Sequence, residues 1–334
     1  MSLACLPKNN LFALAKLALS RDGSFIDTLY QQITAEIAES GACPVSYIFS
    51  LGWIGGASAY AKLLELASLK DNVSVACSAF VLGQLDEIAS HSVLSQLSTS
   101  RDHLISNVAK LAIYWGGGNH CTITTDEASS CSFKNFLYPY ESLSTAPLKN
   151  IKNSCAKDRN ISIIGVSGSG KTSILTSLPN STSRVTIDLD EVVEANTGYD
   201  LSTIFLRFGE TVFRALECSI LLDCLNKPGQ KIIALGGGSA IKHCTSNLIR
   251  NNSFIIYLSA SYTTIQERLR HSINTGGDNK AAKVLLDILP DAFHKLLYYY
   301  RTPFFSALAD AIIETDELSQ AACIDLIIQI ITAE

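Results

Sequence analysis

The sequence has few charged residues and no long apolar run. Asp, Glu, Lys and Arg make up 17% of the 334 residues, below the roughly 25% that is usual in soluble proteins. The 26 basic residues are outnumbered by 31 acidic ones, which gives a net charge of −5, so no basic field would attract nucleic acid or an anionic membrane. No uncharged apolar stretch approaches the roughly 18 residues that cross a bilayer. We therefore expect neither a nucleic-acid-binding protein nor a membrane protein.

Cysteines are sparse, and no two of the ten form a C-x-x-C pair. This pattern excludes a disulfide scaffold, and the pairs His120-Cys121 and His243-Cys244 lack the further ligands that a zinc site requires. The N-terminal residues lack a basic leader and a small-residue cleavage site, so they indicate no secretory signal. We expect a cytoplasmic protein whose cysteines are mostly small buried hydrophobic residues.

Hydrophobic residues, in contrast, are abundant at 47%, and the chain length favours two domains. We predict a helical domain of unknown role over residues 1–120. Within it, apolar residues recur every four positions between Ser24, the expected helix start, and Gly41, the expected stop. Residues 121–157 show no regular period and are interpreted as an irregular linker. A second domain is predicted over residues 158–334.

The second domain alternates short β-rich segments with amphipathic helical ones. This pattern is typical of βαβ units, in which helices cover both faces of a parallel sheet, so the predicted fold class is α/β. Ligands bind such sheets at the carboxyl ends of the strands. The expected strands are Ile161–Gly165, Arg184–Asp188, Lys231–Leu235, Ser253–Leu258 and Asp310–Glu314.

A glycine-rich segment follows the first expected strand. It reads Gly-Val-Ser-Gly-Ser-Gly-Lys-Thr from Gly165 to Thr172 and leads into a helical segment, as a G-x-x-x-x-G-K-T motif requires. Glycines let backbone N–H groups turn toward phosphate oxygens, Lys171 reaches the β- and γ-phosphates, and the Thr172 hydroxyl suits Mg²⁺. Nucleotide binding follows. The residues expected to bind ATP are Gly165, Ser167, Gly168, Ser169, Gly170, Lys171 and Thr172.

Two acidic residues close the second expected strand, in Thr186-Ile187-Asp188-Leu189-Asp190. Side chains two positions apart on a strand point to the same face, roughly 7 Å from each other. Paired carboxylates beside a phosphate pocket suit a division of roles, in which one holds Mg²⁺ and the other accepts a hydroxyl proton. A solvated acidic strand end is the alternative, and the position in a phosphate-binding domain argues against it.

Candidate residues for binding the substrate that accepts the phosphate lie further along the chain. Glu210 and Arg214 are one helical turn apart, which favours a surface ion pair. Alternatively, Glu210 or Glu217 orients the Arg214 guanidinium toward a substrate carboxylate. Gly236, Gly237 and Gly238 end the third expected strand and indicate either a tight turn or a ligand against bare backbone.

In this order and at these intervals, the motifs resemble the shikimate kinase family of P-loop kinases, over roughly residues 161–334. The resemblance implies a five-stranded parallel sheet with a mobile lid. It implies that Asp188 contributes to the Mg²⁺ site and that Asp190 holds the shikimate hydroxyl and acts as the base. By the same resemblance, Arg214 binds the shikimate carboxylate together with Arg301, from Tyr300-Arg301-Thr302-Pro303, and the triple glycine lines the substrate pocket.

The lid departs from the family pattern. Lys283-Val284-Leu285-Leu286 stands where the family has Arg-Pro-Leu-Leu, and Asn274 stands where the family has another arginine. Lysine is a point charge and does not replace a planar guanidinium, and an arginine acting on the transferring phosphate is worth about 10³–10⁵ in rate. Lys283 is the predicted catalytic lid residue, with Lys280 and Arg270 as alternatives. The loss of these family arginines predicts either slow turnover or a different phosphate-accepting substrate.

The leading hypothesis is therefore a kinase that uses ATP and Mg²⁺ to phosphorylate a hydroxyl of shikimate. A gluconokinase-like kinase is one alternative, since its phosphate loop is similar, although the Gly-Glu-x-x-Phe-Arg and triple-glycine segments point away from it. A nucleotide-binding regulatory protein is another, motivated by the altered lid and the low charge content. The helical first domain is a candidate for binding a protein partner or for self-association.

Overall fold

The computed structural model describes residues 11–20, 23–41, 43–85, 88–115, 156–179, 183–274 and 291–332. The chain divides into two compact units. The helical unit comprises Met1–Thr145, Leu206–Thr211 and Pro290–Leu296, and the sheet unit comprises Ala146–Phe205, Val212–Leu289 and Leu297–Glu334. The expected linker, residues 121–157, lies almost wholly outside the described residues, so the domain boundary stays a prediction.

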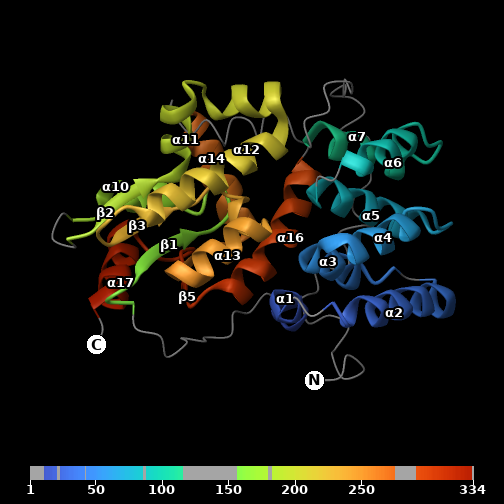
Figure 1. Cartoon of the computed structure of the whole chain (residues 1–334), viewed down its shortest axis with the longest axis horizontal. Coiled ribbons are helices and arrows are strands. Elements are labelled where there is room, and N and C mark those ends of the chain that lie inside the picture. Colours follow the sequence, from blue (N-terminus) through green and yellow to red (C-terminus); the bar gives the residue numbers. More distant parts are fainter. Residues whose placement is uncertain are drawn as a thin grey trace. The chain divides into compact units, whose positions relative to one another are not determined.

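The described part of the helical unit consists of helices (Figure 1). The α3 and α5 helices are buried along nearly their whole length, and Phe49 of α3 contacts Phe80 of α5 with ring centroids 5.8 Å apart. Its helices are α1 (Leu11–Ser20), α2 (Phe25–Ser40), α3 (Val45–Ile54), α4 (Gly56–Leu66), α5 (Asn72–Leu85), α6 (Ile88–Ser98) and α7 (His103–Trp115).

The expected helix after Ser24 is confirmed in α2. Gly41 ends it in the left-handed conformation, with φ 64°, and its N–H donates to the Ile37 carbonyl. This is the geometry for which glycine is favoured at a helix end. Ser24 precedes the helix as expected, but its side chain makes no capping hydrogen bond.

The sheet unit has five parallel strands in the order β2-β3-β1-β4-β5, which confirms the predicted α/β class. Each strand lies within one residue of its expected bounds. The strands are β1 (Asn160–Ile164), β2 (Val185–Asp188), β3 (Lys231–Ala234), β4 (Ser253–Ser259) and β5 (Ala311–Glu314).

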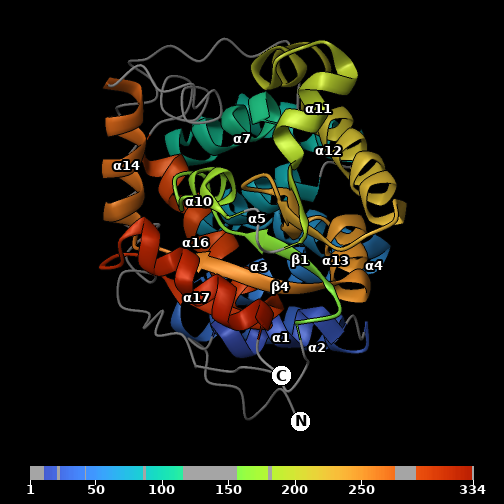
Figure 2. The same cartoon turned by 90° about the vertical axis from the view of Figure 1, so that its left-hand side faces the viewer.

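Helices connect these strands, as Figures 1 and 2 show. No helix within the described ranges is both long and apolar enough to cross a membrane. The connecting elements are α10 (Lys171–Ser177), α11 (Leu189–Thr197), α12 (Leu201–Asn226), the 3₁₀-helix η3 (Ser239–Ile241), α13 (His243–Asn252), α14 (Tyr262–Asn274), α16 (Asp291–Leu308) and α17 (Gln320–Thr332).

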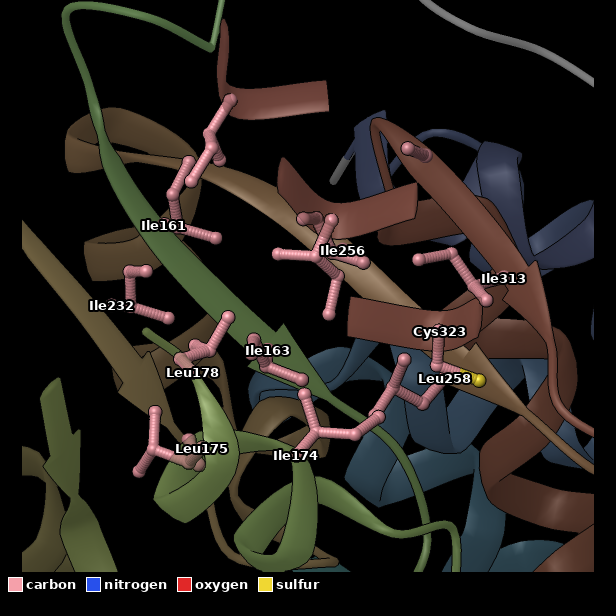
Figure 3. Close-up of a cluster of buried hydrophobic side chains, with 14 of the residues drawn as sticks. Ile161, Ile163, Ile174, Leu175, Leu178, Ile232, Ile256, Leu258, Ile313 and Cys323 are labelled. Carbon is pink, nitrogen blue, oxygen red and sulfur yellow. The ribbon is translucent and has the colours of Figure 1, made fainter. Parts of the chain in front are cut away.

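Both faces of the sheet are covered. The parallel register pairs Ile161 with Ile232 and Phe254, so alternate side chains of neighbouring strands share a face and pack with residues of α10 and α17 (Figure 3). On the opposite face, Tyr257 of β4 contacts Phe305 of α16 with ring centroids 5.7 Å apart. Burial on both faces explains why β1, β3 and β4 are rich in apolar residues along nearly their whole length.

The topology brings three chain segments to one edge of the sheet. The strands β2, β3 and β1 are neighbours and run parallel. Their carboxyl ends therefore lie together, although about 70 residues separate β1 from β3 in the chain. The phosphate-loop motif, the acidic pair and the triple glycine follow these three strand ends in turn.

Candidate active site

The loop between β1 and α10 requires its glycines. A Cβ atom at Gly165 would lie 2.5 Å from Ser169 Oγ and 2.8 Å from the Leu258 carbonyl oxygen. Gly168 and Gly170 have φ of +87° and +96°, values that L-residues rarely adopt. The motif thus has the strand–loop–helix context of a phosphate-binding loop, in which N–H groups and a helix N-terminus face the ligand.

Lys171 is buried at the start of α10. Its ammonium group donates to the carbonyl oxygens of Gly165 at 2.8 Å and Val166 at 3.0 Å. Burial lowers the pKa of Lys171 to about 8, against the opposing effect of the Asp190 and Asp188 charges. The loop therefore holds a cation that a polyphosphate would pair with.

Asp188 and Asp190 do not share a strand face, so that prediction was wrong. The β2 strand ends at Asp188, and Asp190 lies in the first turn of α11. The reason is local: Asp188 Oδ1 accepts a hydrogen bond from the Asp190 backbone N–H at 3.0 Å, which caps α11 and ends the extended conformation.

The second carboxylate oxygen of Asp188 faces the phosphate loop. Asp188 Oδ2 accepts a hydrogen bond from Thr172 Oγ1 at 2.8 Å. A hydroxyl and a carboxylate are hard oxygen ligands, and Mg²⁺ in nucleotide sites typically takes only one or two carboxylates beside the phosphates. The residues present therefore fit the expected metal as a site that the phosphates would complete. Within the described part of the chain, no group of three or more acidic, histidine or cysteine side chains could hold a metal ion.

Asp190 carries an unsatisfied carboxylate oxygen. Its Oδ1 atom is buried and has no hydrogen-bond partner among the described residues, and it would lie 2.8 Å from a Cβ atom placed at Gly236. Burial, together with the charges of Glu217 and Asp188, raises the pKa of Asp190 to about 7, against the opposing effect of Lys171 and Arg214. A carboxyl group that titrates near neutrality suits proton transfer.

Arg214 is held by a buried carboxylate. Its Nη1 group donates to Glu217 Oε2. Arg214 is 7% exposed and Glu217 is 0% exposed. Of the alternatives that the sequence left open, the structure thus favours a buried pair with Glu217 over a surface ion pair. The Glu210 side chain lies outside the described residues.

The triple glycine is the meeting point of the site. A Cβ atom at Gly238 would lie 2.5 Å from Arg214 Nη2 and 2.9 Å from Arg301 Nη2. Arg301 Nη1 also donates to the Gly237 carbonyl oxygen at 3.5 Å. Two buried guanidinium groups that approach one point favour an anion there, since a planar guanidinium binds a carboxylate through two parallel hydrogen bonds.

The same glycines contact the phosphate loop. A Cβ atom at Gly237 would lie 2.6 Å from Ser167 Oγ and 2.7 Å from the Ser167 backbone nitrogen. Any side chain at position 237 would therefore push the loop away. The glycines thus bring the phosphate loop, Asp190 and the two arginines together within the sheet unit.

The predicted lid residues cannot be placed in this geometry from the described part of the chain. Lys280 and Lys283 lie outside the described residues, and Asn274 is the last residue of α14, with its side chain also outside them. Arg270, an alternative lid cation, is exposed on α14 and donates to Gln266 Oε1 at 2.9 Å. The role predicted for Lys283 stays a prediction.

Sequence reasoning did not identify Ser239. This fully buried residue donates from Oγ to Glu217 Oε1, and its Oγ accepts from Arg214 Nη1 at 3.4 Å. The available signal was its position directly after the triple glycine, where a polar residue faces whatever the glycines approach.

The fold and the site define a class. A five-stranded parallel sheet with a phosphate-binding loop after its central strand, a hydroxyl–carboxylate pair beside the loop and a neighbouring carboxyl group are the parts of a P-loop phosphotransferase.

Comparison with known proteins identifies the family. A model of the shikimate kinase family matches residues 167–332. Shikimate kinase of Marinomonas sp. is 32% identical over 166 residues, which are 48% of this chain and 85% of that protein. Shikimate kinase of Pseudoalteromonas atlantica is 32% identical over 174 residues, 52% of this chain and 97% of that protein. The chain belongs to the shikimate kinase family through its C-terminal half.

A solved structure also matches this half. Shikimate kinase from Acinetobacter baumannii, in complex with shikimate, is 24% identical and covers 52% of this chain and 92% of its own, with a TM-score of 0.45. Family membership confirms the resemblance seen in the sequence. It also assigns the chain to the ATP- and Mg²⁺-using phosphotransferases.

Proposed function

We propose that the chain transfers the γ-phosphoryl group of ATP to a hydroxyl of shikimate, giving shikimate 3-phosphate. The observation that carries the proposal is the triple glycine, which Asp190 approaches at Gly236 and which Arg214 and Arg301 approach at Gly238. A small alcohol that also bears a carboxylate matches a proton acceptor placed near two guanidinium groups.

On the donor side, the loop from Gly165 to Gly170 binds the phosphates through backbone N–H groups. Lys171 pairs with the β- and γ-phosphates, and Thr172 and Asp188 hold Mg²⁺, directly or through water. When bound, Mg²⁺ neutralises charge that develops on the transferring phosphoryl group. Phosphoryl transfer depends mainly on such positioning and electrostatic stabilisation.

On the acceptor side, the proposed roles follow from charge. Arg214 and Arg301 bind the carboxylate, and Gly238 lets both guanidinium groups approach it because it has no side chain. Asp190 accepts the proton of the attacking hydroxyl, which its pKa of about 7 allows near neutral pH. Because Gly237 abuts Ser167 of the phosphate loop, the acceptor would lie beside the phosphate that it receives.

A gluconokinase-like activity remains the second enzymatic candidate, since gluconate is also an acid that bears hydroxyl groups. The relatives named above favour shikimate. A regulatory nucleotide-binding role is the candidate from another class. A protein of this class would bind ATP, but neither shikimate nor gluconate would stimulate ADP release.

One assay separates these candidates. ADP release by the full chain is measured with ATP and Mg²⁺ plus shikimate, gluconate or no acceptor. We expect shikimate alone to stimulate release, and Lys171→Ala and Asp190→Asn to lower the stimulated rate by about 10² or more. Asp223→Asn, an exposed carboxylate on α12, is the matched control and should be unchanged. Stimulation by gluconate, or tight ATP binding with no stimulation, would refute the proposal.

A further inference from the structure

Ser239 lies between the triple glycine and the buried Arg214–Glu217 pair. It is the first residue of η3 and follows Gly238 directly. Its side chain is fully buried, and its backbone N–H donates to the Gly236 carbonyl oxygen at 3.1 Å. The residue is therefore part of the triple-glycine turn while its hydroxyl faces α12.

The hydroxyl completes the hydrogen bonding of a buried carboxylate. Glu217 is 0% exposed, and its Oε2 atom accepts from Arg214 Nη1. Its Oε1 atom accepts from Ser239 Oγ. A buried carboxylate needs a donor at each oxygen, because removal from water is otherwise costly. Ser239 supplies the donor that Arg214 does not.

The same hydroxyl also accepts from the guanidinium group. Ser239 Oγ lies 3.4 Å from Arg214 Nη1, so Arg214, Glu217 and Ser239 close a ring of hydrogen bonds. A guanidinium group is planar and rigid, so fixing Nη1 within this ring sets the direction of Nη2. That Nη2 atom is the one that approaches Gly238 beside Arg301 Nη2.

We propose that Ser239 is a positioning residue for acceptor binding, which acts through Arg214. Its hydroxyl fixes the Glu217 carboxylate against Nη1 and thereby aims Nη2 at the carboxylate of the acceptor. Because Ser239 is also part of the glycine turn, its hydrogen bonds fix the Arg214 guanidinium group relative to Gly238. The inference rests on the proposed function, since it assigns the role of Ser239 to binding of the same acid.

The first test compares steady-state constants of the full chain with shikimate and ATP. Ser239→Ala should raise the KM for shikimate on the order of tenfold, the usual effect of losing a hydrogen bond to a charged group. The KM for ATP should stay within about twofold. Ser239→Thr keeps the hydroxyl and should restore much of the affinity for shikimate.

Ser246→Ala is the matched control. Ser246 is 1% exposed on α13, and its hydroxyl donates to the His243 carbonyl oxygen. This variant loses a buried hydroxyl without affecting Arg214, so its KM for shikimate should equal that of the wild type. An equal increase in both alanine variants would show a general packing effect and overturn the inference.

A double-mutant cycle tests whether Ser239 acts through Arg214. In an Arg214→Ala background, Ser239→Ala should cause little further change in the KM for shikimate. An undiminished effect there, or none in the wild-type background, would overturn the inference while leaving the proposed function intact. A wild-type chain that shikimate does not stimulate would overturn both. If Ser239→Ala does not fold, Ser239→Cys, a weaker donor of similar size, should raise the KM for shikimate severalfold above the wild-type value, and an unchanged KM would overturn the inference.

Discussion

Arg214 and Arg301 come from different helices, α12 and α16, and present their Nη2 atoms to the same glycine. A Cβ atom at Gly238 would meet one at 2.5 Å and the other at 2.9 Å. Both arginines are buried, at 7% and 5% exposure. Two buried cations that approach one position repel each other unless a counter-charge is near, and Glu217 supplies part of that counter-charge to Arg214. An anionic acceptor would supply more.

We predict that Arg214→Lys and Arg301→Lys each raise the KM for shikimate about tenfold or more, because a lysine offers a point charge in place of a planar two-pronged donor. The KM for ATP should change little. Steady-state kinetics with each substrate varied in turn would check this.

Arg184→Lys is the control for that pair. Arg184 donates to the carbonyl oxygens of Ala156, Lys157 and Arg159, before the amino end of β1. Its replacement should lower the thermal midpoint without changing either KM. Equal effects of all three arginine variants on the shikimate KM would contradict the assigned roles.

Alanine at neighbouring glycines should separate the two substrates. At Gly238, whose φ is −123°, a methyl group would displace the ends of two arginine side chains, so the KM for shikimate should rise with little loss of stability. At Gly237, it would meet the Ser167 backbone nitrogen at 2.7 Å and displace the phosphate loop, so the KM for ATP should rise as well. Substrate-specific kinetics and thermal unfolding of both variants provide the measurement.

The activity should depend on pH in a narrow neutral range. The Asp190 carboxyl must be ionised to accept a proton, and its pKa is raised to about 7, first by burial and then by Glu217 and Asp188. Lys171 must be protonated to pair with phosphate, and burial lowers its pKa to about 8. Hence kcat/KM, which reports the unliganded enzyme, should fall below pH 7 and above pH 8.

Asp190→Asn provides the test of the acid side of this profile. The variant lacks a carboxyl group to protonate, so its low residual kcat/KM should no longer fall as the pH drops from about 7 to 6. An unchanged acidic decline in the variant would assign that titration to another group.

The lid role predicted for Lys283 is open to a direct test. If it replaces the family arginine as a point charge, Lys283→Ala should lower kcat by about tenfold or more, with a smaller effect on either KM. Lys283→Arg should raise kcat above the wild-type value, since a guanidinium group pairs with phosphate through two hydrogen bonds. Rapid-quench measurement of the transfer step would distinguish chemistry from product release.

Local sequence was enough to predict much of this molecule. Alternating strand and helix patterns identified all five strands. In β1, β3 and β4 the signal comes from burial on both faces, which requires nearly continuous apolar residues. The phosphate loop was evident for a similar reason: its glycines, lysine and threonine act through local backbone geometry within eight residues, from Gly165 to Thr172.

The error at Asp188 and Asp190 also has a local cause. Alternation along a strand applies only while the strand continues, and Asp188 caps a helix that begins at the next residue. The aspartate side chain competed with the strand ladder for a backbone N–H group. Read as a helix cap, Asp188 would have placed Asp190 on α11 from sequence alone.

What the chain order could not decide is which distant groups meet. The choice of Glu217 as partner of Arg214, the part that Ser239 plays between them, and the approach of Arg301 to Gly238 all depend on how α12, η3 and α16 pack around the sheet. Residues 214 and 301 are far apart in the chain, and no periodicity encodes their separation. The sequence by itself determined the strands and the phosphate loop, since these depend on neighbours in the chain. Only tertiary packing decided the acceptor side, because contacts between separate elements arise when the sheet brings its strand ends together.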